Sequence, residues 1–95
     1  MKETNTTVEW LEEGVLTLPE RVNIETAPVI LSQVERSARV FDAVDFVKVK
    51  QVDSVALAML LNWQALAGQP LKIKNLPSQL ATLIDLYDLN KTLVV

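Results

Sequence analysis

The stretch that determines the fold class runs from Val40 to Lys74 and reads VFDAVDFVKVKQVDSVALAMLLNWQALAGQPLKIK. Its first part, residues 40–47, is rich in β-branched and aromatic residues, which is typical of a buried strand. Residues 54–67 are apolar with high helix propensity, and Gly68 can end such a helix in the left-handed conformation. Residues 71–74 alternate apolar side chains with lysines, as a strand does. Strand, helix and strand in this order predict a right-handed parallel crossover.

The residues before this unit predict a β-hairpin and a first helix. Short apolar runs at residues 8–10 and 15–18 flank Gly14, which can take the positive φ of a tight turn. Pro28 suits the first turn of a helix, and the apolar spacing after it predicts a helix over about residues 28–39.

The residues after the unit predict one more helix and a short edge strand. Pro77 opens the helix, whose apolar stripe is expected to consist of Leu80, Leu83, Ile84 and Tyr87. Residues 92–95 are expected to form the strand. The chain, residues 1–95, is therefore predicted to be a single α/β domain with a mixed β-sheet in the order β-β-α-β-α-β-α-(β) and helices packed on it.

The composition removes most catalytic chemistry. Cysteine and histidine are both absent, so the chain lacks a thiol nucleophile, the commonest general base at neutral pH and the usual ligands of zinc. Gly14 and Gly68 are the only glycines, too few for a Gly-rich phosphate loop, and no EF-hand motif occurs. We therefore expect a non-catalytic protein without a cofactor or a metal ion.

The charge and the hydropathy pattern restrict the partners. A net charge of −3 and a pI of about 4.8 disfavour nucleic acid or an anionic membrane surface. Lys48, Lys50, Lys72 and Lys74 are interpreted as ordinary solvated surface. The longest apolar run, residues 55–61, is too short to span a bilayer, and the polar N-terminus precedes no signal-peptide core. A cytoplasmic protein without direct membrane insertion is expected.

The functional signal lies where the central strand passes into the second predicted helix. Asp53 and Ser54 both suit an N-cap, where their side-chain oxygens would accept hydrogen bonds from the first turn. On a helical wheel, Leu57, Leu60 and Leu61 fall on one side, which we assign to the core. Gln64 lies in the same arc, so a helix rotated by about one residue stays an alternative.

The opposite side of this helix is a second apolar stripe with a methionine and a tryptophan, residue types enriched at interfaces. We expect it to dock onto a protein partner. The predicted partner-binding surface consists of Asp53, Ser54, Val55, Met59, Asn62, Trp63 and Leu66. The alternative is that this stripe packs beneath another helix of the same domain.

Several motifs together resemble the STAS domain family. They are the Asp53-Ser54 step with Leu57, Leu60 and Leu61 behind it, Asp45 upstream, and the segments Asn75-Leu76-Pro77 and Leu83-Ile84-Asp85-Leu86-Tyr87-Asp88-Leu89. The resemblance covers nearly the whole chain and implies a STAS-like fold. The sequence departs from the family pattern after Ser54, where Val55-Ala56 stand in place of the usual small residue and glycine.

The resemblance implies two kinds of partner. The chain looks most like the MlaB-like branch, the small cytoplasmic STAS subunits of Mla phospholipid ABC transporters, because of its length and its tryptophan-containing hairpin. This likeness implies an accessory subunit that binds the ATPase subunit (MlaF-like), in a complex with permease and lipid-binding subunits that maintains outer-membrane lipid asymmetry. It would lie peripheral to the inner membrane. The other branch implies an anti-sigma factor antagonist, in which Ser54 would be phosphorylated.

A third hypothesis comes from the carboxylates alone. Asp45 and Asp53 could hold Mg²⁺ beside a nucleotide. Without a phosphate cradle or a general base, two carboxylates provide little stabilisation of a transition state, so we rank this hypothesis last.

Overall fold

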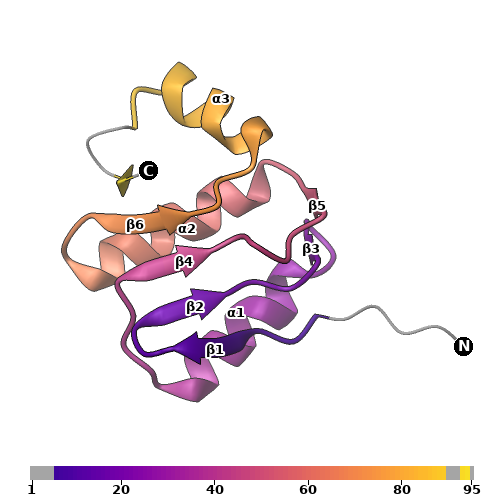
Figure 1. Cartoon of the computed structure of the whole chain (residues 1–95), viewed down its shortest axis with the longest axis vertical. Helices are drawn as coiled ribbons and strands as arrows, with labels where there is room; N and C mark the ends of the chain where they lie inside the picture. The colour runs from indigo at the N-terminus through magenta and orange to yellow at the C-terminus, as the bar shows by residue number, and fades with distance from the viewer. Residues whose placement is uncertain (1–5, 90–92, 95) are drawn as a thin grey trace, which may run out of the picture.

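A five-stranded β-sheet with helices packed on it forms the protein (Figure 1). The structure is a computed structural model that describes residues 6–89 and 93–94. Its elements are, in chain order, β1 (Glu9–Glu12), β2 (Val15–Thr17), β3 (Arg21–Val22), α1 (Ala27–Ser37), β4 (Ala43–Asp45), β5 (Gln51–Val52), α2 (Val55–Ala67), β6 (Leu71–Lys74), α3 (Ser78–Leu86) and β7 (Leu93–Val94).

The five strands lie in the order β1-β2-β4-β6-β7. Only β1 and β2 are antiparallel, joined by a turn in which Gly14 has a φ of 78°. β4 is the central strand, and its Val44 pairs with Leu16 of β2 and with Ile73 of β6 in parallel register. The predicted hairpin, the parallel crossover through α2 and the mixed α/β sheet are thus confirmed.

The central strand is shorter than predicted. Residues 40–47 were expected to be extended, but β4 covers only Ala43–Asp45, backbone hydrogen bonds across the sheet reach one residue further on each side, and Val40 is 92% exposed. The strand ends because the Asp45 carboxylate turns the chain: its Oδ1 accepts hydrogen bonds from the Val47 backbone N–H (2.9 Å) and from Asn75 Nδ2 (2.8 Å). A high β propensity at the flanking valines does not overcome this local bonding.

A second, two-residue parallel sheet, β3 with β5, was not predicted. It is continued by a bond from the Asp53 N–H to the Val22 carbonyl (3.1 Å) and by one from Asn23 Nδ2 to Gln51 Oε1 (2.9 Å). Buried Thr26 completes the junction, since its Oγ1 accepts from the Asn23 N–H and donates to the Arg21 carbonyl. These bonds hold the start of α1 beside the start of α2.

The helices bury one face of the sheet. α2 contacts α1, α3 and β6, so it has neighbours on several sides (Figure 1). The completely buried core side chains include Leu16, Ile30, Val44, Leu60, Leu71, Leu80 and Leu93. This arrangement leaves only part of α2 in contact with solvent.

The last helix and strand agree with prediction except at one residue. Leu80 and Ile84 are buried and Leu83 is half-buried, as the predicted stripe requires. The prediction that Tyr87 belongs to the apolar stripe is wrong, because α3 ends at Leu86 and Tyr87 is 61% exposed. β7 confirms an edge strand, although positions 92 and 95 of the predicted range lie outside the described residues.

Candidate partner-binding surface

The two large side chains expected on the docking side of α2 are buried within the monomer. Met59 is 3% exposed and Trp63 is 5% exposed. The prediction that these two residues face a partner is therefore wrong. They pack inside the same domain, which is the alternative that the sequence left open.

An aromatic cluster explains why Trp63 lies inside. Its ring contacts Phe41 edge-on, with ring centroids 5.8 Å apart, and Phe41 contacts Trp10 of β1 at 5.7 Å. Such tilted pairs contribute favourably beyond the area they bury. The chain segment between α1 and β4 thus supplies a partner for Trp63 that helical spacing alone does not reveal.

The whole helix is turned relative to the prediction. Its buried residues are Ala56, Leu57, Met59, Leu60 and Trp63. Gln64 and Leu61, both assigned to the core arc, are only half-buried. The shift corresponds to roughly one residue, or about 100° of helix rotation, and it takes Gln64 away from the core.

The solvent side of α2 carries a continuous, uncharged surface, which we call the α2 outer face. It consists of Ser54, Val55, Ala58, Asn62, Ala65 and Leu66, of which Val55 is half-buried and the others are exposed. No residue from 55 to 67 is charged. A solvent-exposed helix face normally carries charged side chains, so this one has the composition of a contact surface.

The outer face retains part of the predicted partner-binding set and adds to it. Ser54, Val55, Asn62 and Leu66 belong to the outer face, and the exposed Asp53 adjoins it at the start of α2. Ala58 and Ala65 were missed because small side chains carry no hydropathy signal of their own. Their spacing relative to Val55 and Asn62, three or four residues apart, is the signal that could have identified them.

Asp53 and Ser54 play different roles at the start of α2. Asp53 Oδ1 accepts a hydrogen bond from the Val55 N–H (2.9 Å), so Asp53 provides the expected capping contact. The Ser54 side chain makes no cap bond, and Ser54 itself has helical dihedral angles. Its exposed hydroxyl is therefore available for a contact with another molecule or for modification.

Apolar side chains also surround this helix start. The loop that follows β3 lies beside residues 51–53 through the β3–β5 pairing, and it carries Ile24, which is 74% exposed. Val29, in the first turns of α1, is exposed as well. No sequence pattern selects Ile24, because its position depends on the unpredicted β3–β5 sheet.

The other charged groups singled out in the sequence have structural partners. Lys48 pairs with Glu9, Lys50 with Glu20 and Lys74 with Glu12, so most of the lysine patch is neutralised by carboxylates. Asp45 bonds to its own loop and to Asn75, as described above. Within residues 6–89 and 93–94, no three acidic residues group in a way that could hold a metal ion.

Comparison with known proteins identifies the family. In the described part of the chain, no helix has the length and apolar character needed to cross a membrane. A search of curated proteins finds no match. A family model described as "Mlab, STAS domain" matches residues 6–95, nearly the whole chain. On this match and the mixed α/β architecture, the chain belongs to the MlaB-type STAS domain family.

Proposed function

We propose that this protein is a non-catalytic accessory subunit of an Mla-type phospholipid ABC transporter. It binds the cytoplasmic ATPase subunit through the α2 outer face and supports assembly and activity of a complex that also contains permease and lipid-binding subunits. In this role it contributes to outer-membrane lipid asymmetry from the cytoplasmic side of the inner membrane. The observation that carries the proposal is an exposed helix face without a charge that begins at the unengaged hydroxyl of Ser54.

The composition of the α2 outer face suits a protein contact. Ala58 and Ala65 allow the backbone of a partner to approach closely, and an uncharged face pays no cost for removing ions from water. Leu66 at one end, and Ile24 in the neighbouring loop beside the other end, are exposed apolar side chains that can act as anchors. Between these two anchors, Ser54 and Asn62 can form directional hydrogen bonds with the partner.

A second candidate function rests on the same hydroxyl. As an anti-sigma factor antagonist, the protein would be switched by phosphorylation of Ser54, which is exposed and makes no cap bond. A phosphate would add a charge of about −1.5 to −2 at a helix N-terminus, where the helix dipole favours negative charge. The same charge would stand beside the Asp53 carboxylate and on an otherwise uncharged contact surface, where it is unfavourable. Modification would thereby release a partner bound to the outer face.

Affinity purification from the native cell separates the two functions. With a tagged chain as bait, we expect the ATPase and permease subunits to co-purify, and Ser54 to be unphosphorylated in every growth phase by mass spectrometry. An Ala58→Arg bait serves as the control for the surface and should lose both subunits. Recovery of a protein kinase instead, together with phosphate on Ser54, would contradict the transporter role and support the antagonist role.

A further inference from the structure

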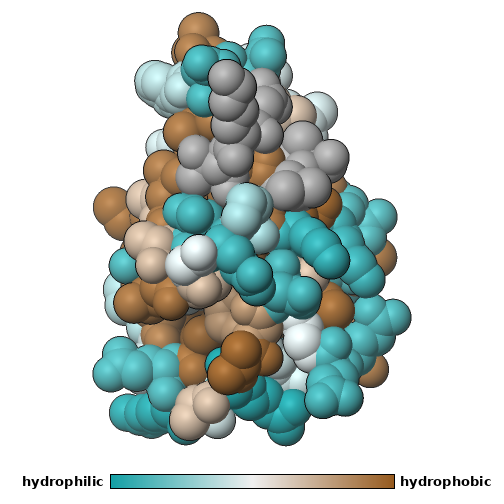
Figure 2. Space-filling model, turned by 90° about the vertical axis from the view of Figure 1, so that its left-hand side faces the viewer, coloured by the Kyte–Doolittle hydropathy of each residue, from teal (hydrophilic) through white to brown (hydrophobic). Residues whose placement is uncertain are grey.

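A groove of about 560 Å³ lies between the C-terminal halves of α1 and α2. It opens at the end of the molecule where both helices finish (Figure 1), and Figure 2 shows apolar residues exposed among hydrophilic ones on that side. The groove adjoins the α2 outer face, because Asn62 and Leu66 belong to both. Its apolar walls include Leu31, Val34, Phe41, Trp63 and Leu66.

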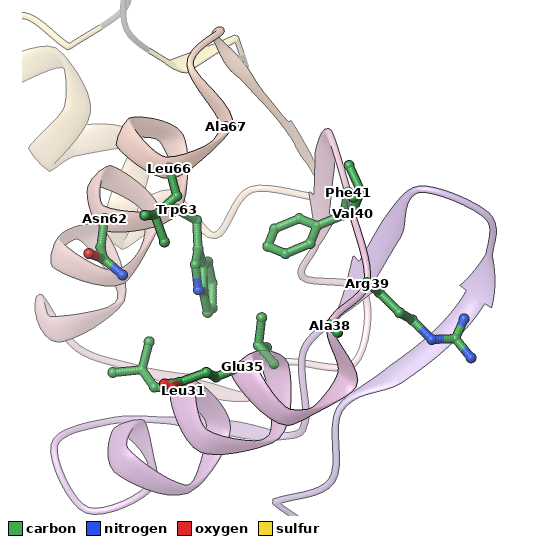
Figure 3. A pocket seen from close by; sticks show the side chains of 11 residues that line it. Leu31, Glu35, Ala38, Arg39, Val40, Phe41, Asn62, Trp63, Leu66 and Ala67 are labelled. Carbon is green, nitrogen blue, oxygen red and sulfur yellow. The ribbon is translucent and has the colours of Figure 1, made fainter.

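The groove contains a hydrogen-bond donor, the indole N–H of Trp63. This side chain is 5% exposed, and its N–H makes no hydrogen bond within residues 6–89 and 93–94. The nitrogen is not sealed off from solvent, and Figure 3 shows it on the edge of the ring away from Phe41. The N–H of a buried tryptophan normally has a partner. This one is therefore available to a carbonyl oxygen of another molecule.

The charged group beside the groove is the carboxylate of Glu35. Figure 3 shows the Glu35 side chain directed toward Leu31. The Arg39 side chain extends the other way, and its guanidinium lies over the ring of Trp10, 5.3 Å from the ring centroid and outside the groove. Among the residues that the structure describes, Glu35 forms no ion pair. The rim of the groove thus carries a negative charge that a partner can neutralise.

Aromatic rings, a carboxylate and an indole N–H are the groups that a protein segment with an arginine satisfies together. A guanidinium is planar and cationic, so it stacks on an aromatic ring and forms two parallel hydrogen bonds with a carboxylate. The methylene groups of arginine cover apolar walls. The same segment brings backbone carbonyls, one of which can accept from the Trp63 N–H. A lysine lacks the planar group, and an anion would be repelled by Glu35.

We propose that the groove receives an arginine of the ATPase subunit, which pairs with Glu35 and lies against Trp63, while an apolar neighbour of that arginine covers Phe41. This inference rests on the proposed function, because it extends the contact made by the α2 outer face. A partner seated on that face reaches the groove directly through Asn62 and Leu66. Arginine and tryptophan are among the residue types that dominate the binding energy of protein interfaces.

Biolayer interferometry with the purified ATPase subunit tests the charge at the rim. Glu35→Arg should weaken binding about tenfold or more, because it removes the carboxylate and sets one cation against another. Glu13→Arg is the matched control, since it makes the same charge change at an exposed residue of the β1–β2 turn, outside the lining, and should bind as the wild type does. Both positions are exposed, so neither variant should change the melting temperature appreciably.

Crosslinking and a charge exchange identify the arginine. A p-benzoylphenylalanine at position 67, an exposed position of the lining, should form an adduct with an ATPase peptide that contains an arginine. Changing that arginine of the ATPase subunit to glutamate should weaken binding to the wild-type chain about tenfold or more. Glu35→Arg should then restore the affinity, because the two charges have been exchanged.

The possible results distinguish a failure of this inference from a failure of the proposed function. If the wild type binds the ATPase subunit and Glu35→Arg loses no more affinity than Glu13→Arg, the groove does not receive an arginine, although the transporter role stands. An adduct peptide without an arginine, or no recovery in the charge exchange, leads to the same conclusion. An adduct between two copies of the chain would assign the groove to self-association. No binding of the wild type would overturn the proposed function and this inference with it.

Discussion

Trp63→Asp is expected to unfold most of the protein at 25 °C. Trp63 is 5% exposed and contacts Phe41 edge-on, so the change removes a large core side chain and places a carboxylate in an apolar, aromatic environment. Replacing a buried tryptophan by alanine costs about 3–5 kcal/mol, and an unpaired buried charge costs several kcal/mol more. Domains are stable by only about 5–15 kcal/mol. Circular dichroism and urea titration measure the loss directly.

Leu66→Asp is the matched control for this variant. It introduces the same carboxylate into the same helix, three residues further along, but at a position that is 78% exposed. Its unfolding free energy should stay within about 0.5 kcal/mol of the wild type, as for most surface changes. If Trp63→Asp kept the wild-type urea midpoint, Trp63 would not be a core residue and the assignment of the faces of α2 would be wrong.

Ala58→Arg is expected to weaken binding to the ATPase subunit by about a hundredfold or more. Ala58 lies at the centre of the α2 outer face, and a guanidinium there would be buried in the contact on a helix that carries no charged residue from 55 to 67. A buried, uncompensated charge costs about 3–5 kcal/mol, equivalent to a factor of more than a hundred in affinity. Biolayer interferometry with the purified ATPase subunit provides the dissociation constant.

The fold should tolerate this substitution. Ala58 is exposed and arginine has a helix propensity close to that of alanine, so the melting temperature should not change appreciably. Ala81→Arg makes the same change at an exposed position of α3, away from the outer face, and should bind as the wild type does. An equal loss in both variants, or no loss in Ala58→Arg, would argue against the outer face as the docking surface.

Much of the architecture could be predicted because local signals and the hydrophobic pattern agree. Gly14 and Gly68 both have positive φ, at the hairpin turn and at the end of α2, where a residue without a Cβ is favoured. The alternation in β6 buries Leu71 and Ile73 and exposes Lys72 and Lys74. Each of these features depends on a few neighbouring residues, and such features are the ones that a sequence specifies most directly.

The orientation of α2 could not be predicted in the same way. A helix that is apolar on all sides has no preferred direction in a helical wheel, and α2 has neighbours on the sheet, on α1 and on α3. Its rotation is decided by the aromatic cluster of Trp10, Phe41 and Trp63, which joins three distant parts of the chain. Gln64, the one polar residue in the assigned core arc, was the only local sign of the error.

The surroundings of Ser54 depend on another long-range feature. β3 and β5 are only two residues each, too short for a recognisable pattern, yet their pairing brings the loop with Ile24 next to Asp53. The candidate surface therefore combines a helix that the sequence predicted with a loop that it did not. In the sequence, the Asp53-Ser54 step marks the start of this candidate surface, and the spacing of small residues marks the exposed face of α2.

Site-specific photo-crosslinking can show whether the α2 outer face contacts the ATPase subunit, as proposed. A p-benzoylphenylalanine placed at position 58 of the tagged chain, and one placed at position 81 as the reference, would be irradiated in the native cell and the adducts identified by mass spectrometry. We expect an adduct with the ATPase subunit from position 58 and none from position 81. An adduct from position 81 alone, or none with that subunit from either position, would refute the proposed contact.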